Sequence, residues 1–171
     1  MSTYPFQVHD LVNYRNSGVC EISEIRMEDL GMGKKAYYIL RSIKDNGTTI
    51  KIPVDSPAVA TNMHHVLSRE EIDAAIMDAE EMERRWITDY KERSAEFEAI
   101  LLRGERKEIL TMIKTLAFYR ENCLKSNRKF GTTDARLLER AESAIKQEFA
   151  YSLNIPEDEV IPYIIRKATG A

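Results

Sequence analysis

The 171-residue chain lacks the features that mark membrane-spanning, secreted or disulfide-bonded proteins. No apolar run approaches the roughly 18–20 residues that a membrane span needs. The first ten residues, MSTYPFQVHD, do not combine a basic segment with an apolar one, as a secretory signal does. Only two cysteines occur, Cys20 and Cys123, and reduced, buried thiols suit them better than a disulfide. We therefore expect a cytoplasmic protein.

Glycine and proline are also scarce, with 7 and 5 residues, which leaves little room for a long disordered linker. Neither sign of charge dominates, because 25 Lys and Arg stand against 28 Asp and Glu, a formal net charge of −3. This balance excludes a uniformly basic coat for nucleic acid and an acidic solvating tail. The hydrophobic content of 43% and the charged content of 31% are typical of a folded protein with much helix.

Residues 1–66 have the pattern of short strands and turns. Aromatic and β-branched residues, which favour pleated, half-buried surfaces, gather in four runs. The runs cover residues 6–14, 19–25, 37–40 and 48–54. Asn46-Gly47 precedes the last run and suits a tight hairpin turn, since both residues tolerate positive φ angles. Four or five short strands at this spacing predict a small antiparallel β-barrel as the N-terminal domain.

From residue 67 onward the apolar residues recur at helical spacing. Ser68 and Glu71 form a Ser-x-x-Glu capping box at the start of the first expected helix. Four further helices are expected from about Trp86 to Arg103, from Arg106 to Leu124, from Thr133 onward and from Pro156 onward. The chain is therefore predicted to be an α+β protein, with an all-α domain of about five helices at 67–171.

Signals of catalysis and of metal binding are weak. The chain has no glycine-rich phosphate loop and no serine within a Gly-x-Ser-x-Gly motif. His64-His65 could hold a metal, but no cysteine or carboxylate completes a ligand spacing, and a surface turn is the favoured interpretation. We expect no enzyme activity, metal, cofactor or small-molecule substrate. An enzyme that uses this histidine pair, or a pair of carboxylates, is a third hypothesis, which a stoichiometric metal in the purified protein would revive.

The small net charge hides a segregation of charge along the chain. Residues 69–98 carry a net charge of −6, and residues 99–140 carry +5. Five of the ten basic residues of the second stretch lie in a polar loop, KSNRKFGT, and in the helix that follows it. They are Lys125, Arg128, Lys129, Arg136 and Arg140. Such a patch attracts nucleic acid without sequence preference. The competing interpretation is an ordinary solvated helical surface, and charge alone favours it.

Trp86 is the only tryptophan in the chain. It follows Arg84 and Arg85 and precedes Tyr90 and Lys91. Most buried tryptophans anchor one helix to another, and the local sequence favours that role. The alternative is an exposed aromatic wedge, flanked by cations, that enters a base step from the minor groove of DNA.

The order of several motifs resembles that of the CarD-type bacterial transcription regulators. The opening, Phe6-Gln-Val-His-Asp10-Leu-Val-Asn-Tyr14, is similar to the family's Phe-x-x-Gly-Asp-x-Val-x-Tyr. Further segments that resemble family blocks are Tyr37–Leu40, Thr49–Asp55, Trp86–Lys91, Leu102–Gly104 and Ala135–Ala141. The resemblance covers roughly residues 6–153. Each motif is weak alone, but their common order and spacing are fairly specific.

The resemblance implies a Tudor-like N-terminal domain that docks on the β subunit of RNA polymerase. The polymerase contact would fall on Ile50, Lys51 and Ile52, with Arg26 as a further candidate. The resemblance also implies a helical domain that contacts promoter DNA at the upstream edge of the −10 region. There the tryptophan would act as a minor-groove wedge and stabilise the open complex. The implied DNA-binding residues are Trp86, Arg85, Lys91, Lys125, Arg128, Lys129, Arg136 and Arg140.

Four positions depart from the family's pattern. His9 replaces a glycine, Thr88 and Asp89 stand where arginines are frequent, and Ala135 stands where a lysine often precedes Arg136. The missing cations predict weak intrinsic binding to DNA, delivered mainly by tethering to polymerase. The alternative is a protein-interaction module on polymerase that makes no direct DNA contact. We expect a monomer without membrane association.

Overall fold

The computed structural model describes residues 3–45 and 47–170 of the chain. The chain divides into two compact units, Met1–Val66 and Leu67–Ala171. The division falls where the apolar pattern of the sequence changes from strand-like to helix-like spacing. None of the helices in the described ranges has both the length and the apolar character that crossing a bilayer requires.

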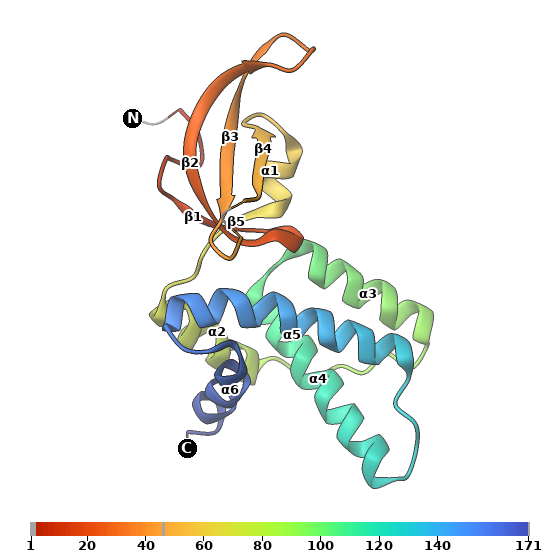
Figure 1. Cartoon of the computed structure of the whole chain (residues 1–171). Helices are drawn as coiled ribbons and strands as arrows, with labels where there is room; N and C mark the ends of the chain where they lie inside the picture. Colours follow the sequence, from red (N-terminus) through yellow and green to blue (C-terminus); the bar gives the residue numbers. More distant parts are fainter. Residues whose placement is uncertain (1–2, 46, 171) are drawn as a thin grey trace. The chain divides into compact units, whose positions relative to one another are not determined.

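The described residues of the first unit form a five-stranded antiparallel sheet, a 3₁₀ turn at Arg15–Ser17 and one short α-helix (Figure 1), which confirms the predicted small antiparallel β-domain. The strands are β1 (Leu11–Tyr14), β2 (Gly18–Asp29), β3 (Lys34–Ser42), β4 (Thr49–Pro53) and β5 (Met63–His65). They are hydrogen-bonded in the order β4-β3-β2-β1-β5, so β4 and β5 stand at the two ends of the sheet. The helix α1 (Pro57–Asn62) connects these two strands along the chain.

Two features of this unit differ from the sequence expectations. The pattern of apolar residues does not predict α1, which is too short to show a helical period. His64 and His65 belong to β5 and pair with Asn13 and Val12 of β1. The prediction of a surface turn at these histidines is therefore wrong. A strand of three residues carries no alternation, so its pairing with β1 decides the conformation.

One carboxylate organises the turn between β3 and β4. Asn46 of the predicted Asn-Gly turn lies outside the described residues. Near it, Asp45 accepts hydrogen bonds from the Thr48 hydroxyl at 2.5 Å and from the backbone N–H of Gly47 at 3.0 Å. These bonds favour the charged carboxylate, so they hold the pKa of Asp45 below its ordinary value.

The core of the β-unit is built around Tyr38, which is fully buried. Its ring makes an edge-to-face contact with Phe6 at a centroid distance of 6.0 Å. Its hydroxyl accepts a hydrogen bond from the backbone N–H of Phe6 at 3.3 Å. The buried core residues are Phe6, Val12, Cys20, Ile22, Tyr38, Leu40, Ile52, Val59 and Met63. The residues before β1 are therefore fixed to the sheet by the same ring that fills its core.

His9 adopts a backbone conformation that explains why a glycine suits this position. Its φ angle is 73°, in the left-handed region. Its backbone N–H donates to the carbonyl of Ile22 at 2.8 Å, which holds the strained residue in place. Its ring Nδ1 lies 2.8 Å from a carboxylate oxygen of Glu21. A left-handed conformation costs a non-glycine residue roughly 1–2 kcal/mol.

Replacing His9 by glycine should therefore give a more stable protein than replacing it by alanine, by about 1 kcal/mol in the free energy of unfolding. Urea denaturation of the two variants measures this difference. Val8, whose φ is not positive, provides the matched control, and there alanine should be the more stable of the two. Equal stability of the glycine and alanine variants at position 9 would contradict the strain argument.

The described residues of the second unit form five α-helices, as predicted. The helices are α2 (Arg69–Glu81), α3 (Tyr90–Arg103), α4 (Arg106–Lys125), α5 (Thr132–Leu153) and α6 (Val160–Thr169). The last helix begins at Val160, after a 3₁₀ turn at Glu157–Glu159, rather than at the expected Pro156. The helix α5 contacts each of the other four, so it lies at the centre of the unit.

Capping side chains decide where two of these helices begin. Ser68 and Glu71 form the predicted capping box at the start of α2. The helix α3 begins at Tyr90 rather than at the expected Trp86. The cause is Asp89, whose carboxylate accepts hydrogen bonds from the backbone N–H groups two and three residues later, at 3.0 and 2.9 Å. The segment that carries Trp86 is therefore a connection between helices and not a part of α3.

Two bidentate ion pairs are buried in the helical unit in addition to its apolar core. Arg106 at the start of α4 binds Glu148 of α5, with bonds of 2.9 and 2.6 Å. Arg93 in the first turn of α3 binds Asp134 in the first turn of α5, with bonds of 3.0 and 2.9 Å. Each pair joins a neighbouring helix to the central helix α5.

Both cysteines are buried and free, as expected from their number and spacing. Burial raises the pKa of the Cys20 thiol, which keeps it protonated. The structure therefore supports reduced thiols that act as small apolar core residues.

Candidate functional site

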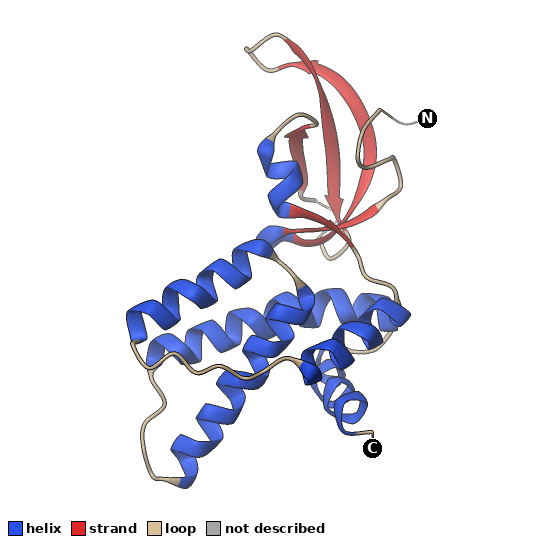
Figure 2. Cartoon of the chain, turned by 180° about the vertical axis from the view of Figure 1, so that it is seen from behind, coloured by secondary structure: helices blue, strands red, loops and turns tan. Residues whose placement is uncertain are grey.

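The connection from α2 to α3, residues 82–89, crosses over α4 (Figure 2). Two of its side chains lie on consecutive aromatic residues of that helix. The indole of Trp86 stacks on the ring of Tyr119, with centroids 3.7 Å apart and planes 13° from parallel. The guanidinium of Arg84 lies over the ring of Phe118, 4.1 Å from its centroid. These contacts fix the connection on the surface of α4.

Trp86 is half-buried and packs against the core of the helical unit. This placement combines parts of both sequence interpretations. The ring anchors the connection to α4, as most tryptophans of helical domains do, yet part of its surface stays accessible to solvent. The neighbouring Arg84 and Arg85 are exposed.

The Trp86 stack extends to the basic loop that joins α4 to α5. Phe130 of this loop lies against Tyr119, with ring centroids 6.5 Å apart and planes inclined by 50°. The structure therefore brings three aromatic residues from separate segments together, namely Trp86, Tyr119 and Phe130. The tryptophan and the basic loop are anchored to the same ring of α4.

The predicted DNA-binding cations are all exposed, but they differ in their partners. Lys125 pairs with Glu121 at 2.9 Å, and Arg140 pairs with Glu98 at 2.6 Å. The other predicted cations form no ion pair within the part of the chain that the structure describes. They are Arg85, Lys91, Arg128, Lys129 and Arg136.

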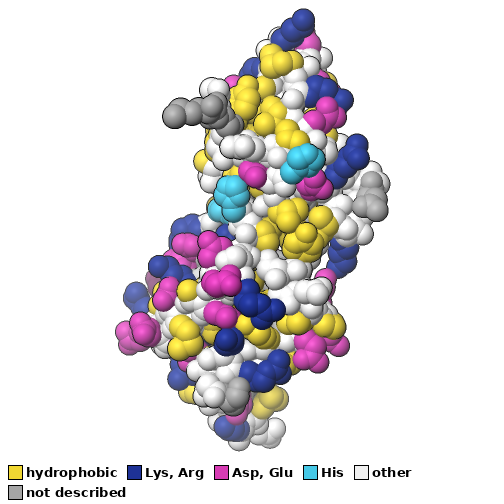
Figure 3. All heavy atoms as spheres, turned by 90° about the vertical axis from the view of Figure 1, so that its left-hand side faces the viewer, with side chains coloured by type: hydrophobic (Ala, Val, Ile, Leu, Met, Phe, Trp, Pro, Cys, Tyr) yellow, Lys and Arg dark blue, Asp and Glu magenta, His cyan; other side chains and the backbone are white. Residues whose placement is uncertain are grey.

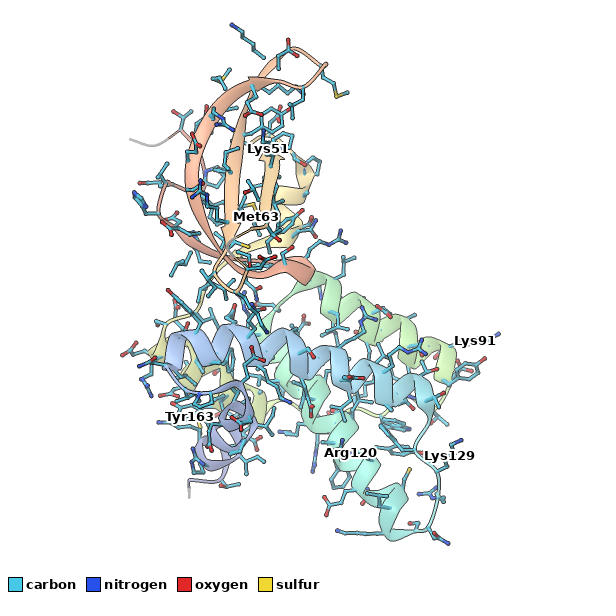
Figure 4. The ribbon with its side chains drawn as sticks, viewed as in Figure 1. Lys51, Met63, Lys91, Arg120, Lys129 and Tyr163 are labelled. Atoms are coloured by element: carbon cyan, nitrogen blue, oxygen red, sulfur yellow. The ribbon has the colours of Figure 1, made fainter. Side chains whose placement is uncertain are left out.

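These cations are spread over the α2–α3 connection, α3, α4, the α4–α5 loop and α5. Lys91 and Lys129 lie at the end of the helical unit where α5 begins, and Arg120 lies on α4 (Figure 4). Lys125 and Arg140 each pair with a glutamate, so carboxylates lie among the predicted cations. Lys and Arg are also intermixed with Asp and Glu on the face drawn in Figure 3, which is the side away from Lys91 and Lys129. Cations that alternate with carboxylates bind a phosphate backbone weakly. The geometry therefore suits a local contact beside Trp86 better than a long electrostatic track.

Two of the positions that depart from the family's pattern have structural roles. Asp89 caps α3, and the carbonyl of Thr88 accepts a hydrogen bond from Arg93 at 3.2 Å. Ala135 is exposed in the first turn of α5, beside Arg136. The acidic cap adds a negative charge close to Trp86, which opposes the attraction of the cations there.

The predicted polymerase-binding residues lie in the β-unit. Lys51 is exposed on the end strand β4 (Figure 4), and its ammonium donates to both carboxylate oxygens of Glu28, at 3.0 and 2.8 Å. Arg26 binds the same carboxylate at 2.5 Å. The hydrogen bond from Lys51 and the two positive charges hold the pKa of Glu28 below its usual range. The carboxylate of Glu28 thus binds both Lys51 and Arg26.

The two isoleucines that flank Lys51 face the opposite way. Ile52 is 4% exposed in the core of its own unit, and Ile50 packs partly buried against that core. Their side chains are therefore occupied within the β-unit. What β4 offers a partner is the exposed Lys51 and the backbone of an end strand.

Several residues that build this region were not singled out by the sequence patterns. Arg93 has no local signal, because its partner Asp134 lies 41 residues away. Tyr119 lies on α4 and Phe130 in the loop that follows it, and the contacts that join their rings to Trp86 depend on how the segments pack. Among the described residues, no group of three or more His, Cys, Asp or Glu side chains is arranged to hold a metal ion.

A comparison with family models matches residues 6–66 to the CarD-like/TRCF RID domain. The match covers all five strands of the β-unit and ends at its boundary with the helical unit. It therefore confirms the resemblance of the first motifs and leaves the resemblance around Trp86 as a prediction. A comparison with curated proteins found no match.

Proposed function

Because residues 6–66 belong to the CarD-like/TRCF RID domain family, we propose that this RNA polymerase-interacting, transcription-related protein stabilises the open promoter complex. In this proposal the β-unit binds the polymerase β subunit. The helical unit contacts promoter DNA at the upstream edge of the −10 region, with Trp86 as the minor-groove wedge. The proposal assigns no catalytic reaction to the chain.

The observation that carries the DNA-contact part is the position of Trp86. It is half-buried on Tyr119, next to exposed Arg85, and it shares its aromatic support with the basic loop of Arg128 and Lys129. An apolar side chain that unstacks a base step needs a firm support behind it and cations at its sides. This arrangement supplies both.

The polymerase contact would use the outer edge of β4. An end strand has backbone N–H and C=O groups available for an added strand of a partner. The exposed Lys51 beside that edge would contribute charge and orientation. Because Lys51 already binds Glu28, an acidic residue of the partner would compete with an internal carboxylate. This competition favours a contact of moderate strength.

Recruitment by polymerase compensates for weak DNA affinity. The cations near Trp86 are few, and the acidic cap Asp89 lies beside them. A tethered module needs little intrinsic affinity, because tethering raises its effective concentration at the promoter. Stabilising the open complex increases transcription where opening limits the rate and decreases it where promoter escape does.

Replacing Trp86 by alanine should remove most of the gain in open-complex lifetime that the protein confers. Stacking of an aromatic side chain on a base is worth roughly 1–3 kcal/mol, so we expect the gain to fall about fivefold or more. The measurement is the decay of competitor-resistant complexes of polymerase with a ribosomal-type promoter. Tyr151→Ala, which removes an exposed aromatic residue at the other end of α5, is the control and should leave the lifetime unchanged.

A second candidate function is a protein-interaction module on polymerase without DNA contact. The observation that favours it is that the cations of Lys125 and Arg140 are already paired within the chain. Footprinting of the promoter in the polymerase complex separates the two functions. Protection at the upstream edge of the −10 region that is the same with and without the protein would favour this module and contradict the wedge.

A further inference from the structure

The guanidinium of Arg93 joins three of the segments around Trp86. The side chain is 8% exposed and uses four N–H groups within the helical unit. Two of them donate to the carboxylate of Asp134, at 3.0 and 2.9 Å. The other two donate to the backbone carbonyls of Ile87 and Thr88, at 2.8 and 3.2 Å. One side chain thus joins α3, α5 and the connection that carries Trp86.

The same guanidinium also contacts the indole directly. Its Cζ atom lies 4.3 Å from the centroid of a Trp86 ring, a distance typical of a cation–π contact. The two carbonyls that it binds belong to the residues immediately after Trp86. Arg93 therefore restrains both the ring and the backbone that positions it, while Tyr119 supports the ring by stacking.

These contacts do more than complete a buried ion pair, because two of the N–H groups that Asp134 does not accept find their partners on the connection and not within α3 or α5. A buried pair is satisfied when its own atoms are hydrogen-bonded, and its contribution to stability is often small compared with apolar packing. Here half of the bonds of Arg93 go to the α2–α3 connection, which has no regular secondary structure of its own. Without them, the segment around Trp86 would depend mainly on the stack with Tyr119 and on the contact of Arg84 with Phe118.

We propose that Arg93, held by Asp134, is a positioning residue that fixes the orientation of Trp86 for its contact with promoter DNA. This inference rests on the proposed function. A ring that is held in one orientation before binding loses less conformational freedom when it inserts. A planar guanidinium is needed for this role, because it binds the carboxylate and both carbonyls in one plane, and a lysine ammonium lacks that fork.

The test uses Arg93→Lys in the full chain, with Arg106→Lys as the matched control. Arg106 forms the other buried bidentate pair, with Glu148, so both variants lose a fork of the same kind. Arg106 and Tyr119 lie 13 residues apart on α4, about 20 Å along the helix, so the control leaves the Trp86 stack untouched. Far-UV circular dichroism first shows that each variant is folded.

The first readout is the fluorescence of Trp86, which reports on this ring alone because it is the only tryptophan. We expect Arg93→Lys to raise the quenching of this fluorescence by acrylamide about twofold and to lower its anisotropy, and Arg106→Lys to change neither. Asp134→Asn keeps the shape of the partner without its charge and should shift the signal in the same direction. Asp134→Asn therefore serves as the test variant if Arg93→Lys does not fold.

The second readout is the lifetime of the open complex. Arg93→Lys should lose a large part of the gain that Trp86→Ala loses, and the double variant should lose no more than Trp86→Ala alone. Unchanged quenching in folded Arg93→Lys, or equal changes in Arg93→Lys and the control, would overturn the positioning role. A lifetime that is insensitive to Trp86→Ala, with a fluorescence change confined to Arg93→Lys, would instead overturn the proposed function and show an anchor without a role in DNA contact.

Discussion

Replacing Glu148 by alanine should lower the free energy of unfolding of the helical unit by about 3–5 kcal/mol. The carboxylate binds the guanidinium of Arg106 through two bonds, and the two side chains are 1% and 10% exposed. Removing the carboxylate deprives the largely buried charge of Arg106 of this partner, and little of the guanidinium surface is open to solvation by water. The large effect comes mainly from leaving a buried positive charge without its carboxylate, and less from the favourable energy of the pair itself. Urea denaturation measures it.

Glu98→Ala provides a control with the same ion-pair distance. Glu98 and Arg140 also approach to 2.6 Å, but their side chains are 53% and 49% exposed. Water solvates both charges when this pair is broken, so we expect a loss of about 0–1 kcal/mol. Similar losses in the two variants would show that burial does not decide the strength of these pairs. Both pairs join an Arg to a Glu at the same closest distance, although the buried pair has two hydrogen bonds and the exposed pair has one.

Replacing Tyr38 by alanine should destabilise the β-unit by about 3–5 kcal/mol. The side chain is fully buried at the centre of the sheet's core, where it contacts Phe6. Its removal leaves a cavity that the sheet cannot close without shifting β3. The unfolding of this unit should also abolish polymerase binding, which the proposed function assigns to β4. Thermal denaturation and a polymerase pull-down measure the two effects.

Two variants test the cause of this effect. Tyr38→Phe keeps the ring but removes the acceptor of the Phe6 N–H, so it should cost only about 1 kcal/mol. Met27→Ala on β2 removes a side chain that is 61% exposed and should change stability by less than about 0.5 kcal/mol. A loss in Tyr38→Ala as small as that of Met27→Ala would contradict the assignment of Tyr38 to the core.

The hydroxyl of Tyr38 also gives the β-unit a sensitivity to high pH. Burial raises the pKa of this phenol above its ordinary value of 10.0. A raised pKa means that the unfolded chain loses this proton at a lower pH than the folded one. The associated stability is complete below pH 10 and is lost as the pH rises through the higher pKa of the folded state. Tyr38→Phe should show a flatter loss of stability in this range.

The sequence predicts the polymerase-binding part of the proposed function more completely than the DNA-contacting part. The motifs from Phe6 to Asp55 are short, but each lies on a strand or turn of one small domain, and the family match to residues 6–66 confirms them. The motif that begins at Trp86 predicts a tryptophan next to cations, which the structure contains. It also suggests a helix from Trp86, which the cap at Asp89 prevents.

Local patterns in the sequence determined the α+β class, the strand runs and the capping box at Ser68. Each of these depends on the spacing of apolar residues or on neighbours within a few positions. Only the tertiary structure decided the surroundings of Trp86, because Tyr119, Phe130, Arg93 and Asp134 come from four separate segments. Their contacts depend on how helices pack, and a chain of residues carries no local signal of a partner 41 positions away.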